Sequence, residues 1–333
     1  MTIRVLQIGL GPIGVAVARQ IVGRDGFELV GGVDPDPQKV GRDLGEIMGL
    51  DRALSMPVQD ALEGALESLR PDVAVVCTSS SLERTAPTFE TCLAAGVAVV
   101  STTEELSYPW FHQPELARRL DQAARDGGRA LLGTGVNPGF AMDALPLTLT
   151  AVCERVDGVT VRRVQDAARR RLPFQKKIGA GLTVEAFEQG VAAGRIRHVG
   201  LPESIAMIGA GLGWELDDIA ETIEPVVAEE RVASAELAVE AGQVCGLRQL
   251  GFGREGERVR VRMEFEARLG VTASFDEVEI QGSPSLRSRI DAGIPGDVAT
   301  ASVVVNAIPR VLAAPAGLIT MKDLPPAVSI ART

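Results

Sequence analysis

A glycine-rich turn between a predicted strand and a predicted helix constrains this chain most. The run IRVLQIGL (residues 3–10) is rich in β-branched residues and too short for a stable helix, so we expect a buried strand. It leads into GLGPIG (9–14) and then into VAVARQIV (15–22), which has helix-forming composition. A strand, a glycine turn and a helix in this order are typical of an α/β fold with a doubly wound parallel sheet.

Each glycine of this turn has a physical task in binding a dinucleotide. Gly9 permits the tight turn, Gly11 lets a pyrophosphate approach the backbone, and Gly14 lets the helix pack closely on the strand. The helix N-terminus then faces the negative charge of the phosphates. The alternative is a glycine turn in an α/β domain that binds no ligand. The predicted cofactor contacts in the turn are Gly9, Gly11, Pro12 and Ile13.

The second predicted strand, FELVGGVD (27–34), ends on an acid that bears on the choice of cofactor. Asp34 follows Gly14 by 20 residues, where a carboxylate can bind the hydroxyls of the adenosine ribose. This carboxylate favours NAD, because it would repel the ribose phosphate of NADP. Lys39 and Arg42 follow closely enough to bind that phosphate, so the use of both NAD and NADP stays open.

Further strands bring polar residues to the same edge of the sheet. DVAVVCTSSS (72–81) ends in hydroxyls, VAVVST (97–102) is the fourth strand, and 129–133 is the fifth. The carboxyl ends of parallel strands line the ligand crevice, so we expect the hydroxyls to contact a phosphate or the nicotinamide ribose. Alternatively, they cap the helix predicted after residue 81. The hydroxyl residues are Thr78, Ser79 and Ser80.

Two adjacent acids follow the fourth strand, in VVSTTEELSYP (99–109). If this segment is extended, the side chains of Glu104 and Glu105 point to opposite faces, so only one addresses the nicotinamide. A carboxylate there can act as a general base, and desolvation would raise its pKa toward neutrality. Alternatively, Glu104 caps the turn and binds nothing.

Composition excludes several classes of protein. The net charge is −10 with acidic and basic residues mixed along the chain, which disfavours nucleic-acid binding. The four cysteines are far apart and no metal-ligand spacing is present, so we expect no metal site. No signal peptide and no apolar run of about 18 residues is seen, so we expect a cytoplasmic protein that does not enter a membrane.

The second half has a different pattern. Segments 155–167, 258–269 and 271–282 alternate like strands with one solvated face, whereas 185–194, 201–213 and 231–245 look helical. We therefore predict a dinucleotide-binding domain at 1–145 and an α+β domain for substrate and subunit contacts at 146–295. An apolar helix and tail at 296–333 would return to the first domain, which makes the second domain an insertion.

The motifs together resemble the 2,4-diaminopentanoate dehydrogenase family, which includes native NAD(P)-dependent amine dehydrogenases. The segments that carry the resemblance are GLGPIG, VDPDPQKVGRDLGE, CTSS, STTEELSYP, GTGVNPGF, QDAARRRLPFQKKIGAGLT, HVGLPES and VVNAIPRVLAAPAGLITMKDLP. The nucleotide domain is distantly similar to dihydrodipicolinate reductase. The chain lacks the paired-histidine motif and the Pro-Ser-Gly-Thr stretch of that enzyme, which argues against the reductase activity.

The resemblance implies reductive amination of a small ketone or aldehyde with ammonia, with Glu104 handling protons, and a homodimer. Alternatives are a carbonyl or imine reductase that needs no ammonia, and a nicotinamide-binding redox sensor without catalysis. Four residues are predicted to contact the substrate: Asn137, Phe140, Phe174 and His198. Asn306 in the return helix would reach the nicotinamide, or else satisfy buried backbone groups.

Overall fold

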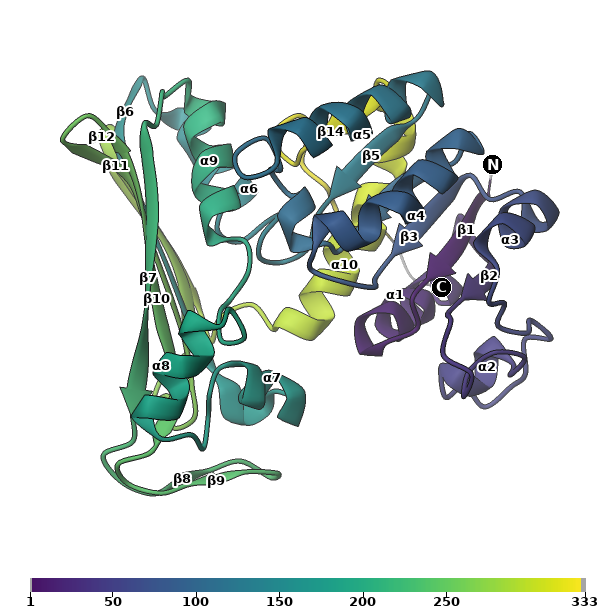
Figure 1. The fold of residues 1–333 in the computed structure, drawn as a ribbon. Helices are drawn as coiled ribbons and strands as arrows, with labels where there is room; N and C mark the ends of the chain where they lie inside the picture. Colours follow the sequence, from purple (N-terminus) through teal and green to yellow (C-terminus); the bar gives the residue numbers. More distant parts are fainter. Residues whose placement is uncertain (1, 331–333) are drawn as a thin grey trace. The chain divides into compact units, whose positions relative to one another are not determined.

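The protein consists of two compact units in a computed structural model that describes residues 2–330 (Figure 1). One unit contains residues 1–140 and 295–333, and the other contains residues 141–294. The second unit is therefore inserted into the first, ahead of the C-terminal helix. The predicted boundary at 145 lies inside helix α6 (Ala144–Leu149), and the second unit begins just before that helix.

The first unit is built on one six-stranded parallel sheet with the order β14-β5-β4-β3-β1-β2. The predicted doubly wound fold is confirmed. Its elements are β1 (Ile3–Ile8), α1 (Pro12–Val22), β2 (Phe27–Val33), α2 (Leu44–Ile47), α3 (Leu62–Leu69), β3 (Val73–Val76), α4 (Leu82–Ala94), β4 (Ala98–Ser101), η1 (Glu104–Leu106), α5 (Pro114–Asp126), β5 (Ala130–Gly133), α10 (Gly296–Ala313) and β14 (Gly317–Ile319).

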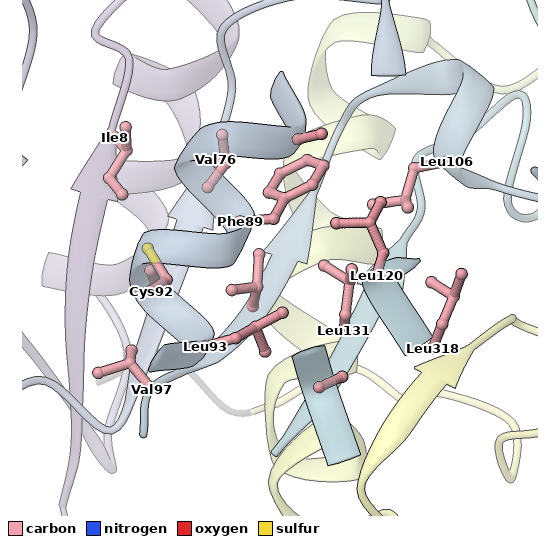
Figure 2. Close-up of a cluster of buried hydrophobic side chains, with 14 of the residues drawn as sticks. Ile8, Val76, Phe89, Cys92, Leu93, Val97, Leu106, Leu120, Leu131 and Leu318 are labelled. Carbon is pink, nitrogen blue, oxygen red and sulfur yellow. The ribbon is translucent and has the colours of Figure 1, made fainter. Parts of the chain in front are cut away.

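Helices cover both faces of this sheet, which is why its central strands are buried throughout. Every residue of β3, β4 and β5 is buried. On one face, Phe89 and Leu93 from α4 and Leu120 from α5 pack with Leu131 of β5 in a single core (Figure 2). On the other face, α10 contacts α1 and lies against β3, β4 and β5. The return helix therefore completes the first unit, as predicted from the sequence.

The second unit contains a mixed six-stranded sheet with the order β13-β12-β6-β11-β10-β7 and a two-stranded hairpin. All strand pairs in the large sheet are antiparallel except β11 with β6. Its elements are α6, η2 (Thr150–Val152), β6 (Arg155–Asp166), η3 (Ala167–Arg169), α7 (Leu172–Lys177), α8 (Val184–Ala192), α9 (Leu201–Leu212), β7 (Asp218–Val227), β8 (Val232–Ala233), β9 (Ala238–Val239), β10 (Val244–Glu255), β11 (Arg258–Arg268), β12 (Phe275–Ser283) and β13 (Leu286–Asp291).

Helix α9 covers one face of the second sheet, across β7, β10 and β11. Glycines in β10 make this close packing possible. A side chain at Gly251 or Gly253 would lie within 2.7 Å of Ile205 on α9. Strand residues between these glycines therefore point to the opposite face. Among residues 2–330, no helix is long and apolar enough to span a membrane.

The prediction of a helix at 231–245 is wrong, because this segment forms the β8–β9 hairpin and the start of β10. The hydroxyl of Ser234 accepts hydrogen bonds from the backbone N–H groups of Glu236 and Leu237, which stabilises a turn in place of a helix. Gly242, with φ of +87°, ends the segment in a conformation that a helix does not allow. Local turn chemistry overrides the Ala- and Glu-rich composition here.

Candidate active site

The glycine turn has the geometry of a phosphate-binding loop. Gly9 has φ of +83°, and a Cβ there would lie 2.5 Å from the carbonyl oxygen of Cys77. A Cβ at Gly14 would lie 1.9 Å from the carbonyl oxygen of Gly9, so only glycine allows α1 to begin this close to the turn. Nothing lies within 4 Å of the position of a Cβ at Gly11, which leaves room for a ligand against the backbone there. The turn therefore fits a dinucleotide pyrophosphate at the N-terminus of α1.

Asp34 lies at the end of β2, directly beside this turn. Its buried carboxylate accepts hydrogen bonds from the backbone N–H of Leu10 (2.7 Å), from that of Asp36 (3.0 Å) and from Nζ of Lys39 (3.0 Å). Burial alone would raise the pKa of Asp34, but these three donors outweigh it and hold the pKa below its usual value. Asp34 thus presents a charged acceptor beside the glycine turn, with the cation of Lys39 next to it.

The hydroxyl residues after β3 do not cap helix α4. Ser79 Oγ accepts a hydrogen bond from the N–H of Ser81 (3.1 Å), and Ser81 at the N-cap makes no side-chain cap. The N–H of Leu82, the first residue of α4, instead donates to the carboxylate of Glu105 (2.8 Å). The structure places Thr78 against the glycine turn, 2.8 Å from the position of a Cβ at Gly9, and Ser79 and Ser80 follow it along the chain.

The two adjacent glutamates have different surroundings. Glu105 accepts hydrogen bonds from Leu82 and from Nε2 of Gln113 (2.9 Å). Glu104 is partly buried, and among residues 2–330 its carboxylate makes no hydrogen bond or ion pair. The expectation of an extended segment was wrong, because residues 104–106 form a 3₁₀ turn. In such a turn neighbouring side chains diverge by about 120°, so the two acids still point in different directions.

The loop after β5 brings Asn137 to the same edge of the sheet. The backbone N–H of Thr134 donates to the carbonyl of Ser101 at the end of β4 (2.8 Å). A Cβ at Gly139 would lie 2.5 Å from the backbone nitrogen of Gly135, so this loop is tightly closed. Asn137 and Phe140 both follow β5 and are partly buried. The edge therefore gathers the glycine turn, Asp34, the hydroxyl residues, Glu104 and Asn137.

Asn306 is not brought to this edge. Its side-chain oxygen accepts hydrogen bonds from the guanidinium of Arg24 and from the N–H of Ile330. Arg24 follows the C-terminal end of α1, whereas the glycine turn precedes its N-terminal end. The structure thus pairs Asn306 with a side chain that follows α1 and with one backbone N–H of the tail, away from the glycine turn.

Phe174 and His198 belong to the second unit, where cationic side chains surround them. The guanidinium of Arg170 lies 4.2 Å from the ring centre of Phe174. The His198 ring stacks on Phe265 with centroids 4.3 Å apart. Burial lowers the pKa of His198 to about 3, and the charge of nearby Lys177 acts in the same direction. The imidazole is therefore neutral at physiological pH and cannot donate a proton as a cation.

Sequence reasoning missed several polar residues that hold the site together. Ser101 and Thr103 are buried hydroxyl residues on either side of the end of β4, and they hydrogen-bond to each other (3.0 Å). The cap provided by Glu105 could not be found either, because its partner Leu82 is 23 residues away. Within residues 2–330, no group of three or more potential ligands could hold a metal ion.

Two family models match the chain. The C-terminal domain of 2,4-diaminopentanoate dehydrogenase matches residues 140–333, and the N-terminal part of dihydrodipicolinate reductase matches residues 3–108. A 2,4-diaminopentanoate dehydrogenase from Acetoanaerobium sticklandii is 33% identical, over 97% of this chain and 93% of its own. An amine dehydrogenase from Streptomyces virginiae is 26% identical, over 92% of this chain and 89% of its own.

The fold is also that of a solved amine dehydrogenase. The structure of the enzyme from Mycobacterium smegmatis superposes with a TM-score of 0.87 at 28% sequence identity. The match covers 98% of this chain and 97% of that chain. Similarity therefore extends over both units and is not limited to the nucleotide-binding unit.

Proposed function

Since this chain belongs to the 2,4-diaminopentanoate dehydrogenase family, we propose that it is an NAD(P)-dependent amine dehydrogenase. The reaction interconverts a primary amine with ammonia and the corresponding ketone or aldehyde. In the direction of amination, ammonia adds to the carbonyl carbon, water leaves, and the resulting iminium carbon accepts a hydride. The reduced nicotinamide supplies that hydride when it is bound.

One observation carries the catalytic part of this proposal. At the end of β4, Glu105 is engaged by two donors, whereas the Glu104 carboxylate has no side-chain partner within the described chain. An unengaged carboxylate can accept a proton from the attacking nitrogen and return it to the departing hydroxyl. Its negative charge also stabilises the cationic iminium. We assign both roles to Glu104.

The proposed substrate is a small amine, or the ketone or aldehyde that corresponds to it. The curated relative is named for 2,4-diaminopentanoate, which makes a short diamino acid or its oxo form the first compound to test. We propose that Asn137, Phe140, Phe174 and His198 contact the substrate. His198 would serve as a neutral wall of the site, because its low pKa prevents it from carrying charge.

The test is an assay of NAD(P)H oxidation with ketones and aldehydes, in the presence and absence of ammonia. We expect turnover that requires ammonia, and a fall in kcat of about 10²–10⁴-fold in Glu104→Gln with cofactor affinity unchanged. Glu83→Gln is the matched control, because Glu83 is an exposed glutamate at the start of α4. Turnover without ammonia would indicate a carbonyl or imine reductase. Cofactor binding without any hydride transfer would contradict an enzymatic function.

We propose that the chain uses both NAD and NADP. The Asp34 carboxylate can bind ribose hydroxyls, and Lys39 beside it can neutralise a ribose phosphate. Lys39→Ala should therefore raise the KM for NADP and leave that for NAD nearly unchanged. Arg42 is exposed and paired with Glu46, so Arg42→Ala should have a smaller effect on the same ratio. Equal changes in the two KM values for Lys39→Ala would refute this assignment.

We propose a homodimer formed through the face of the second sheet that α9 does not cover. One row of directly opposed residues crosses all six strands on this face. The row begins with Thr222 on the edge strand and one apolar residue, Leu250, and its other four members alternate in charge, so it can pair with a two-fold copy of itself. They are Thr222, Leu250, Glu264, Arg162, Glu277 and Arg289.

Light scattering after size exclusion tests the dimer. The wild-type protein should have twice the chain mass of 35.1 kDa. Leu250→Glu should shift it to the monomer mass, because it replaces the apolar member of the row by a charge next to Glu264. Val152→Glu is the control, since Val152 is exposed in the same unit but lies outside the sheet. A monomeric wild type would contradict the proposal.

A further inference from the structure

The turn that carries Glu104 is held by the residues on both sides of it. Before Glu104, the buried hydroxyl of Thr103 donates to the carbonyl oxygen of Ser79 (2.9 Å) and accepts from Ser101 Oγ (3.0 Å). After it, the carboxylate of Glu105 accepts from the N–H of Leu82. The backbone of Glu104, which lies between Thr103 and Glu105, is therefore fixed from both sides.

Both attachments lead to the same segment, residues 79–82. The carbonyl of Ser79 accepts a hydrogen bond from the hydroxyl of Thr103. The carbonyl of Ser80 accepts one from the backbone N–H of Glu105 (3.4 Å), and the N–H of Leu82 donates to the carboxylate of Glu105. This segment also follows Thr78, which lies against the glycine turn. The segment expected to hold the cofactor and the turn with the catalytic acid are thus joined by three hydrogen bonds.

The chemistry of Glu105 suits a fixed anchor. Its negative charge lies at the N-terminus of α4, a helix of 13 residues, where the helix dipole and a free N–H favour an anion. Gln113 provides a second donor from outside the helix, just before α5. Two donors from different elements define the position of this carboxylate, and the 3₁₀ turn transmits that position to the preceding residue.

We infer that Thr103 and Glu105 are positioning residues for Glu104: they set the distance and direction of its carboxylate relative to the cofactor-binding segment. The inference rests on the proposed function, because it assumes that Glu104 exchanges protons with the substrate. A displacement of about 1 Å in a catalytic group can reduce the rate by about 100-fold. Loosening either attachment should therefore lower kcat without removing the acid itself.

The test compares variants that differ by single groups. Thr103→Val removes the hydroxyl and keeps the shape, whereas Thr103→Ser restores the hydroxyl. We expect kcat to fall about 10–100-fold in Thr103→Val and to recover in Thr103→Ser, with the cofactor Kd nearly constant because the glycine turn is untouched. Glu105→Met, which keeps the length of the side chain and removes the acceptor for Leu82, is the second variant if Thr103→Val does not fold. Its kcat should fall in the same way.

The same changes are then made in Glu104→Gln. If Thr103 and Glu105 act through Glu104, they should cause no further loss of the residual rate in that background. Additive losses, or wild-type kcat in both single variants, would overturn the inference. The proposed function fails separately, if wild type shows no ammonia-dependent turnover or if Glu104→Gln retains it. Failure of that function would overturn the positioning role as well.

Discussion

The two large sheets handle polar side chains in different ways. In the parallel sheet of the first unit, helices cover both faces, the strands β3 to β5 are entirely buried, and polar groups gather just beyond the strand ends. In the mixed sheet of the second unit, charged residues stand inside the strands. Arg163 and Asp276 are directly opposed on β6 and β12 and are almost fully buried.

This difference separates polar groups that can react with a ligand from polar groups that are paired with one another and stabilise the fold. A charge inside a buried strand must find a partner, because desolvation is otherwise prohibitive. A carboxylate beyond a strand end can remain without an ion-pair partner, since the loop around it accommodates the group with or without one. Glu104 is such a group, whereas Asp276 binds both the guanidinium of Arg163 and the N–H of Ile294.

The largest effect that would test this comparison is the loss of one partner in the second sheet. Asp276→Leu should reduce the free energy of unfolding of that unit by about 3–5 kcal/mol, because it leaves the charge of Arg163 buried without its counter-ion. Adding Arg163→Met should recover much of the loss. Glu104→Gln should cause no resolvable change, since no hydrogen bond or ion pair within residues 2–330 is removed.

The two tryptophans allow the units to be followed separately in urea. Trp110 lies in the first unit and Trp214 in the second, so variants that keep one tryptophan report one transition each. Only the transition seen by Trp214 should move in Asp276→Leu. If Glu104→Gln destabilised the first unit by a similar amount, the contrast between the sheets would be wrong.

A smaller effect concerns pH. The pKa of folded His198, about 3, lies below the value near 6.5 of the unfolded chain, mainly because of burial. Below pH 6.5, His198 is therefore protonated in the unfolded chain but stays neutral in the folded chain. Stability that is present above pH 6.5 is lost as the pH falls toward 3.

Between pH 7 and 5.5 this histidine should remove about 1 kcal/mol from the free energy of unfolding of the second unit. His198→Phe keeps an aromatic ring to stack on Phe265 and should have a flatter pH dependence over that range. Urea titrations of the two proteins at several pH values provide the measurement. Parallel curves would mean that the folded protein protonates His198 as readily as the unfolded chain does, which would contradict this prediction.

The sequence allowed the first unit and its edge to be predicted because the signals there are local. The glycine turn and Asp34 lie within 26 residues, and each has a backbone conformation or a strand end that explains it. Which of Glu104 and Glu105 is engaged could not be predicted, because the deciding donors come from Leu82 and Gln113. Hydrogen-bond partners that are distant in the sequence produce no periodic pattern of residues from which they could be predicted.

Predictions failed where local turn chemistry or a distant partner overrode composition. The helix predicted at 231–245 gave way to a turn around Ser234, and Asn306 pairs with Arg24 from a segment 282 residues away. Strand β14 was not predicted, since three residues after a helix carry too little pattern. The pairing of Asn306 and the addition of β14 depend on neighbours that only the assembled fold provides.

The smallest effect should come from charges that lie outside both sheets. Arg118 and Glu115 form an ion pair on the outer face of α5, with 63% and 83% of their side chains exposed. Water solvates both groups equally well when they are apart, so Arg118→Ala should leave the urea midpoint of the Trp110 transition unchanged. A clear shift would show that charge is used for stability in the first unit too. The contribution of a charge to stability would then not depend on whether it lies inside a strand.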